Sequence, residues 1–387
     1  MFHYPWGCSS VGRAPESHSG GRGFDSHHLH IRGVAVAEKV YFIKSDKDDL
    51  SLCKKLEEHL TAYGHLDLIE ERDMVAVKTH FGEVKELGYV RPLYFKMLGR
   101  LLKKIKSQPF LTETSTLYKG NRSNGVIHLE HAFRQGFTYE NTGLPILMAD
   151  GLFGDEEIEV PIPGKLYRSV NIASLIVKAQ ALITVSHFTG HIGTGFGAAL
   201  KNLGMGCSSR RGKMMQHSTT KPSIKKSKCT RCGVCVKWCP AEAITMEEKS
   251  AVINKALCIG CGQCLAMCRF DAVAYNWGAS YEDLQKKVVE HAMGVAETKK
   301  GKALYINFLT RISKDCDCMP GYSELIPDIG VLVSRDPVAV DAASIDLFEK
   351  SAGKKLSDMA YNIPYRIQIS YAKEIGFGSP DYELITV

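Results

Sequence analysis

The sequence predicts an α/β fold: a largely parallel sheet with helices on both faces, interrupted by a small inserted domain. Short apolar runs of strand length alternate with amphipathic helical patterns from residue 38 onward. This alternation stops near Lys221 and resumes near Tyr281, and eight of the thirteen cysteines lie between those points. Strands that alternate with helices are typical of a parallel sheet, and a break in the alternation indicates a second domain.

Each predicted element has its own pattern of apolar residues. Predicted strands, which are rich in Val, Ile and Leu, span residues 39–44, 74–78, 110–112, 145–149, 181–185, 303–307 and 331–333. Predicted helices span residues 50–63, 93–105, 128–135 and 338–350, and Gly136 ends the third. We therefore expect the α/β domain at residues 34–220 and 281–387, and the small α+β domain at residues 221–280.

Composition and charge exclude several classes of protein. The formal charge of +7 over 387 residues is only a mild basic bias, which does not indicate nucleic-acid binding. No apolar run approaches the roughly 20 residues that a membrane helix needs. Clustered cysteines indicate metal ligation in a reducing compartment, so we expect a cytoplasmic protein.

Residues 1–33 differ from the rest of the chain. They are rich in Gly, Ser, His and Arg, and they contain no periodic apolar pattern and no apolar run of a secretory signal. The stretch from Cys8 to His30 resembles the conceptual translation of a bacterial tRNA gene. We expect this segment to be an artefactual extension, with the genuine start near Val34 or Val36; the alternative is a real disordered arm.

The cysteine-rich segment contains an internal repeat. Cys229, Cys232, Cys235 and Cys239 have the spacing C-x2-C-x2-C-x3-C, followed by Pro240. The same cysteine spacing recurs 29 residues later at Cys258, Cys261, Cys264 and Cys268. Such spacing wraps three thiolates around one 4Fe-4S cluster and directs the fourth toward a second cluster. The predicted ligands are Cys229, Cys232, Cys235 and Cys268 for the first cluster, and Cys258, Cys261, Cys264 and Cys239 for the second.

The alternative for these cysteines is a pair of zinc sites. Zinc usually takes two C-x2-C pairs separated by a longer gap, whereas these ligands come in quartets. The segment resembles a bacterial two-cluster ferredoxin over about sixty residues, although Arg269 replaces the second proline. The resemblance implies electron transfer and a redox partner protein, and oxygen-labile clusters suggest an anaerobe.

Basic residues flank the first quartet. They are Lys225, Lys226, Lys228, Arg231 and Lys237. Positive charge there should favour an acidic docking partner; the alternative is an ordinary solvated face.

Several further segments resemble one known family. They are Val77–Glu83, Glu113–Gly120, His187–His191, Thr194–Gly206, Cys316–Cys318 and Asp336–Ala339. Together they resemble the prokaryotic family called domain of unknown function family 362, from about residue 38 to residue 350. The resemblance implies little about function, although members of that family often carry the same inserted ferredoxin module.

Polar residues follow the predicted strands, where ligands bind in open α/β sheets. We expect a catalytic site built from His80, Glu83, His187, His191, Cys316 and Cys318. Glu113, Asp150 and Asp336 also follow strands and are further candidates. Each of these residues has a structural alternative, such as a helix cap for Glu113 or Asp150.

The glycine-rich run from Gly190 to Gly197 precedes a short helix. Its backbone N–H groups are candidates for binding a phosphate or carboxylate, although the spacing is neither a Walker motif nor a dinucleotide fingerprint. The alternative is a flexible loop.

Cys316 and Cys318 stand one residue apart. They are predicted either to ligate an additional metal, together with Cys207 or a histidine, or to form a redox dithiol. Two idle thiols are the remaining alternative.

Three functions fit these observations. The first is an iron–sulfur oxidoreductase that passes electrons from the clusters to an unidentified small molecule on the α/β domain. The second is a non-catalytic electron carrier. The third is a metal- or sulfur-handling factor for cofactor assembly.

Overall fold

A computed structural model describes residues 37–45, 48–85, 87–219, 221–276 and 278–387. The extension expected over residues 1–33 lies outside these ranges. Within them, no helix combines the length and the apolar composition that crossing a membrane requires.

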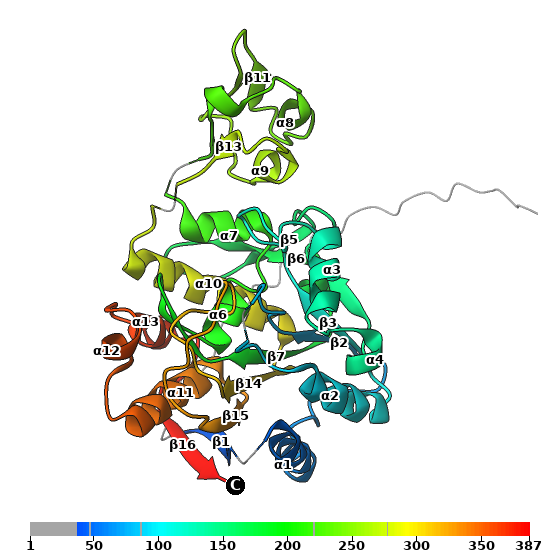
Figure 1. The fold of residues 1–387 in the computed structure, drawn as a ribbon, viewed down its shortest axis with the longest axis vertical. Helices are drawn as coiled ribbons and strands as arrows, with labels where there is room; N and C mark the ends of the chain where they lie inside the picture. The colour runs from blue at the N-terminus through cyan, green and yellow to red at the C-terminus, as the bar shows by residue number, and fades with distance from the viewer. Residues whose placement is uncertain (1–36, 46–47, 86, 220, 277) are drawn as a thin grey trace, which may run out of the picture. The chain divides into compact units, whose positions relative to one another are not determined.

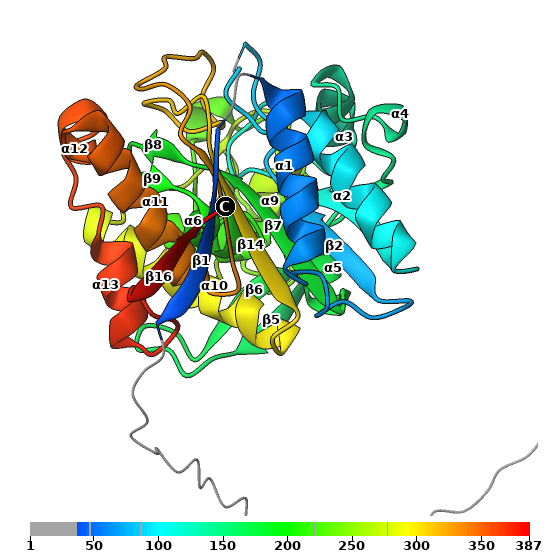
Figure 2. The same ribbon diagram turned by 90° about the horizontal axis from the view of Figure 1, so that it is seen from below.

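An eight-stranded sheet forms the centre of the α/β part (Figures 1 and 2). Its order is β16 (Tyr382–Thr386), β1 (Glu38–Lys44), β15 (Gly330–Ser334), β14 (Ala303–Leu309), β7 (Ala181–His187), β2 (Met74–Lys78), β3 (Gln108–Glu113) and β4 (Ile146–Met148). Strand β15 is antiparallel to both neighbours, and every other adjacent pair is parallel. The predicted α/β class with a largely parallel sheet is confirmed.

Helices cover both faces of this sheet (Figure 2). One face carries α1 (Asp49–Ala62), α2 (Pro92–Lys104), α3 (Gly125–Arg134) and α4 (Tyr139–Thr142). The other carries α5 (Ser174–Lys178), α6 (Ala199–Gly204), α10 (Tyr281–Lys299), α11 (Pro337–Ala352), α12 (Leu356–Met359) and α13 (Ile367–Glu374). Helix α7 (Arg210–His217) packs against α10.

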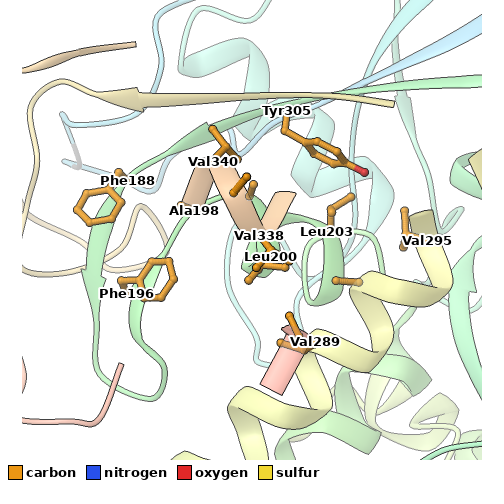
Figure 3. Packing of buried hydrophobic residues seen from close by; sticks show 14 of the residues in the cluster. Phe188, Phe196, Ala198, Leu200, Leu203, Val289, Val295, Tyr305, Val338 and Val340 are labelled. Atoms are coloured by element: carbon orange, nitrogen blue, oxygen red, sulfur yellow. The ribbon is translucent and has the colours of Figure 1, made fainter. Parts of the chain in front are cut away.

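Two apolar cores, one on each face, hold the layers together. Every residue of β7 and β14 is buried, because both strands are covered from both sides. On the α10 side, Phe188 and Phe196 lie beside each other and belong to the same buried cluster as Leu203 and Val289 (Figure 3). Burial of such side chains stabilises each by roughly 1.5–3 kcal/mol.

The direction of β15 has a local cause. A parallel return to the sheet needs a crossover connection, which is usually a helix. Residues 310–329, between β14 and β15, contain no helix among the described elements. The chain therefore turns back directly. As a result, the carboxyl end of β15 lies beside the amino ends of β1 and β14.

Some elements fall where the sequence predicted none. They are the antiparallel pair β5 (Glu157–Pro161) and β6 (Ser169–Ala173), the pair β8 (Thr189–His191) and β9 (Gly195–Gly197), helices α4, α5, α7, α10, α12 and α13, and strand β16. Most are short, and their residues are held by tertiary contacts rather than by a strong local pattern.

The cysteine-rich segment has small elements and a core of its own. Its strands are β10 (Ser223–Ile224), β11 (Ile244–Met246), β12 (Ala251–Ile253) and β13 (Val273–Ala274), and its helices are η1 (Lys226–Lys228), α8 (Val234–Lys237) and α9 (Gln263–Met267). Strands β10 and β13 pair with each other, as do β11 and β12. Buried Ile244, Ile253 and Val273 pack together with Cys264. Figure 1 shows these elements grouped together, in green to yellow.

Candidate functional site

The carboxyl ends of β2, β3, β7 and β14 meet at one edge of the sheet, because these strands are parallel. A cavity of about 510 Å³ opens there. Of the predicted candidates, it is lined by His80, Glu113, His187, His191, Cys316 and Cys318. The structure thus brings together residues that are far apart in the sequence.

A buried ion pair lies in the cavity wall. The Lys78 ammonium is 2.7 Å from the Glu113 carboxylate, and both side chains are almost fully buried. Lys78 also donates to Asn202 Oδ1 at 2.8 Å. Glu113 is therefore the partner of a lysine that the sequence analysis did not select, rather than a helix cap.

Arg122 connects several predicted residues. Its Nε donates to Glu83 Oε2 at 3.1 Å, and Nη1 donates to His80 Nε2 at 2.7 Å. Its Nη2 donates to the Tyr118 hydroxyl at 2.6 Å and to the Cys318 carbonyl at 3.3 Å. Glu83 does not line the cavity itself, but it positions the arginine that holds the Cys318 backbone.

His80 is a neutral imidazole in this arrangement. Both ring nitrogens face donors, since the Gly82 N–H points at Nδ1 and Arg122 points at Nε2. Burial, with Arg122 and Lys78 nearby, holds the pKa of His80 well below its usual value. His80 therefore accepts a hydrogen bond from Arg122 instead of carrying charge.

His187 pairs with an aspartate that lies between the two cysteines. Its Nδ1 is 2.6 Å from Asp317 Oδ1, and its Nε2 is 2.9 Å from the Thr310 carbonyl oxygen. A carbonyl only accepts hydrogen bonds, so Nε2 is the donor there. The contact anchors the Cys316–Cys318 segment to the end of β7.

His191 presents one ring nitrogen to the backbone. The N–H groups of Gly193 and Thr194 donate to Nδ1 at 3.0 and 2.9 Å. Nδ1 is therefore unprotonated, and in the neutral ring Nε2 carries the proton. Burial, with Lys201 nearby, holds the pKa of His191 well below its usual value.

Cys316 and Cys318 are joined by a disulfide in the cavity wall. One ligand atom of His191 and both sulfur atoms lie within 4.8 Å of one another. Of the two partners considered from the sequence, it is a histidine and not Cys207 that joins the pair. Cys207 lies in the apolar core, where burial raises the pKa of its thiol to about 11.

A glycine lets the disulfide loop approach the β8–β9 pair. The Gly190 N–H donates to the Ser313 carbonyl at 2.9 Å. A Cβ at Gly190 would lie 2.2 Å from the Lys314 carbonyl oxygen, which is a backbone atom that cannot simply rotate away.

We expect Gly190→Ala to displace the loop that carries Cys316 and Cys318, because of this backbone clash. After chemical reduction, alkylation of the two thiols followed by mass spectrometry should be faster in the variant than in the native chain. Equal rates would show that the loop does not depend on this close approach.

Two lysines in the cavity wall have lowered basicity. Burial lowers the pKa of Lys201 to about 8, and it does the same to Lys213. Lys213 donates to Thr114 Oγ1 at 2.5 Å and to the Ser208 carbonyl at 2.7 Å. Lysine side chains with a pKa near 8 can gain and lose a proton close to physiological pH.

Besides Glu83, two further candidates from the sequence lie outside the cavity lining. Asp150 is fully buried beneath it and accepts hydrogen bonds from the N–H and hydroxyl of Ser115. Asp336 caps α11 by accepting from Val338 and Ala339. The expectation that Asp336 shares the site is wrong, because β15 is antiparallel and ends at the other edge of the sheet.

The proposal that the backbone between Gly190 and Gly197 binds an anion is also wrong. Its Gly193 and Thr194 N–H groups are occupied by His191. At the start of α6, the N–H groups of Ala199 and Leu200 donate to the buried carboxylate of Asp341. The protein's own acceptors thus take the donors that an anion would need.

The two cysteine quartets form two separate clusters of side chains. Cys229, Cys232, Cys235 and Cys268 line one small cavity. Cys239, Cys258, Cys261 and Cys264 line another. Each group contains the first three cysteines of one repeat and the fourth cysteine of the other repeat. The sequence spacing predicts this arrangement for two clusters.

Residues 75–346 match the family described as Domain of unknown function (DUF362). The chain belongs to this family. In this DUF362 chain, the match begins within β2 and ends within α11, so it includes every cavity residue described above. No curated protein is detectably similar to the chain.

Two solved structures match the chain at low similarity. The lactate racemase apoprotein from Thermoanaerobacterium thermosaccharolyticum is 10% identical, with a TM-score of 0.38, over 71% of this chain and 51% of that one. A protein from Thermotoga maritima is 13% identical, with a TM-score of 0.39, over 78% of this chain and 59% of that one. The DUF362 chain thus matches little more than half the length of either.

Five charged residues of the site were not selected from the sequence, namely Lys78, Arg122, Lys201, Lys213 and Asp317. Asp317 stands between the two cysteines, and Lys201 lies within Thr194–Gly206, one of the segments that carry the family resemblance. Position within a recognised motif was therefore an available signal for both. Lys213 lies on α7, where no local pattern pointed to a site.

Proposed function

We propose that this DUF362 protein is an iron–sulfur redox protein whose electron-transfer module serves the Cys316–Cys318 pair in the cavity. The pair would carry out a two-electron, two-proton reaction on a small molecule bound beside it. The observation that carries this proposal is the presence, in one chain, of two cysteine quartets and a cavity with its own cysteine pair.

The spacing of the sulfur atoms favours clusters over single zinc ions. In a tetrahedral zinc site with Zn–S bonds of about 2.3 Å, the sulfur atoms lie about 3.8 Å apart. Among the described residues, only His191, Cys316 and Cys318 form a group of three ligands mutually within 4.8 Å. No three sulfur atoms of the described quartets therefore lie within 4.8 Å of one another, which suits a larger iron–sulfur cube better than a single zinc ion.

Backbone donors near the quartets also suit anionic sulfur. The Ala243 N–H points at Cys239 Sγ at 3.3 Å, and the Ala251 N–H points at Cys229 Sγ at 3.5 Å. Gly233, Gly260 and Gly262 have φ near +70°, which lets the backbone pass close to the cysteines. Hydrogen bonds to the sulfurs help set the potential of such a group.

Helix α7 lies between the second quartet and the cavity. Its Lys213 and His217 line the cavity. Its Met214 Cε lies 3.1 Å from where a Cβ on Gly262 would stand, next to Cys261. This contact supports a short route between the two sites.

The proposed reaction at Cys316 and Cys318 is balanced in electrons and protons. When bound, each 4Fe-4S cluster would supply one electron, so two clusters match the two electrons that one disulfide accepts. The Cys316–Cys318 bond breaks as it takes two electrons and two protons, and two thiols form. The dithiol then returns two electrons and two protons to an oxidised substrate, and the disulfide re-forms.

Protons are available beside the sulfur atoms. His191 carries a proton on Nε2, and Lys201 holds one up to about pH 8. The Lys201 ammonium could protonate a leaving thiolate, whereas the neutral His191 ring can only donate a hydrogen bond to it, because loss of its Nε2 proton would leave an imidazolate. An external one-electron carrier would supply the electrons, and the exposed basic residues near Cys232, including Lys228 and Lys237, favour an acidic one.

One observation favours a second function, a metal-handling factor. His191, Cys316 and Cys318 are close enough to share a metal ion. The backbone bonds at His191 Nδ1 oppose this, because they leave the proton on Nε2, where it blocks ligation.

Metal analysis separates these functions. After anaerobic purification, we expect about eight irons and eight acid-labile sulfides per chain. Cys316→Ser/Cys318→Ser should leave both values unchanged. Zinc in place of iron would overturn the cluster assignment, and an extra metal lost only in the variant would establish the metal-handling function instead.

A further inference from the structure

The cavity contains one ammonium group that no described acceptor of the protein contacts. Lys201 lines the cavity and has no hydrogen-bond or ion-pair partner in the part of the chain that the structure describes. Gly197 leaves room for its stem, since a Cβ there would lie 3.1 Å from Lys201 Cδ. The ammonium is thus free to meet a ligand.

The other basic side chains have acidic partners. Lys78 pairs with Glu113, and Arg122 pairs with Glu83. The carboxylate of Asp150, in turn, acts on Lys213 and opposes the lowering of its pKa by burial. These charges cancel within the protein.

His187 and Asp317 together are neutral. Nε2 of His187 donates to the Thr310 carbonyl, so it carries a proton. The 2.6 Å contact between Nδ1 and Asp317 Oδ1 needs a second proton, because two lone pairs would repel at that distance. Whichever atom holds the second proton, the pair has no net charge, although the Asp317 carboxylate acts on Lys201 and opposes the lowering of its pKa by burial.

The remaining histidines contribute no charge either. Burial, with cationic side chains nearby, holds the pKa values of His80 and His191 well below the usual value and lowers that of His217 to about 3. The cavity therefore carries one net positive charge near neutral pH, on Lys201.

The rest of the lining is largely apolar. Leu117, Ile192, Met205, Leu284 and Met319 all face the cavity. A volume of about 510 Å³ lies within the range typical of small-molecule sites. A ligand that fits has an apolar body and one negative charge.

We propose that the cavity binds an organic monocarboxylate with an apolar body, whose carboxylate pairs with the Lys201 ammonium beside the Cys316–Cys318 pair. The role of this molecule as a substrate rests on the proposed function, whereas its binding in the cavity does not depend on that function. A single unbalanced charge suits a carboxylate better than a phosphate dianion, and burial of an uncompensated ammonium without a ligand is costly.

Calorimetric titration of the anaerobic, cluster-containing full chain tests the proposal. The probes are acetate, butyrate, hexanoate and octanoate, with hexanol and inorganic phosphate for comparison. We expect hexanoate or octanoate to bind at least about tenfold more tightly than hexanol or phosphate. Failure of every carboxylate to bind, or tighter binding of phosphate, would overturn the proposal.

Variants of Lys201 test whether its ammonium is the counter-ion of the bound carboxylate. Lys201→Met keeps the length of the side chain but removes the charge, and it should weaken hexanoate binding about tenfold or more. Lys201→Arg and the exposed control Lys354→Met should retain binding. Equal affinity of Lys201→Met and the native chain would refute the role of Lys201, provided that the iron content shows the variant to be folded.

The carboxylate site and the redox function can fail separately. If the disulfide takes up no electrons but binding still depends on Lys201, the proposed function fails and the site stands. If the disulfide is reduced but no carboxylate binds, the site fails alone.

Discussion

Replacing both Cys316 and Cys318 with serine should halve the number of electrons that the chain takes up. In a reductive titration with a one-electron reductant, the native protein should accept about four electrons, two for the clusters and two for the disulfide. The variant should accept about two, because its clusters remain but the disulfide is absent. Optical absorbance during the titration provides the measurement.

Cys53→Ser is a matched control, since Cys53 lies on α1 in the apolar core and should not alter the count. Equal uptake by the native chain and the double variant would mean that the disulfide is not in electronic contact with the clusters. The carrier function would then be the better description, with the cavity serving another purpose.

Lys78→Met should destabilise the protein by roughly 3–5 kcal/mol, because it leaves the Glu113 carboxylate buried without its partner. Glu113 would then have to take up a proton or draw water into the cavity wall. Chemical unfolding of the α/β part, followed by circular dichroism, measures the loss in free energy of unfolding.

The double variant Lys78→Met/Glu113→Leu is the matched comparison. It removes both charges, so it should recover much of the lost stability even though the ion pair is gone. If the double variant were as unstable as the sum of the two single variants, the pair would not be coupled as its 2.7 Å distance indicates.

Much of the architecture was predictable because local patterns carry it. The strands over residues 74–78 and 181–187 are buried on both faces and therefore read as continuous apolar runs. Helix α3 ends as predicted, since Gly136 adopts a φ of +86° that few other residues tolerate. Small elements such as β8 and β9 carried no comparable signal.

The candidate site was predictable only in part. Parallel strand order brings His80, His187 and Cys316 to one edge, so the rule for open sheets located them. That rule failed for Asp336, because the direction of β15 depends on a helix-free connection and on pairing with β1 and β14. Strand direction is a property of the assembled sheet.

The sequence by itself determined the residue types, the cysteine spacing and the alternation of strands and helices, because each depends on neighbours in the chain. Only the tertiary structure decided how charges cancel in the cavity. The pairing of Lys78 with Glu113 and of His187 with Asp317 joins residues 35 and 130 positions apart. Those pairings leave Lys201 unmatched, because electrostatic balance depends on distance in space and not on order in the chain.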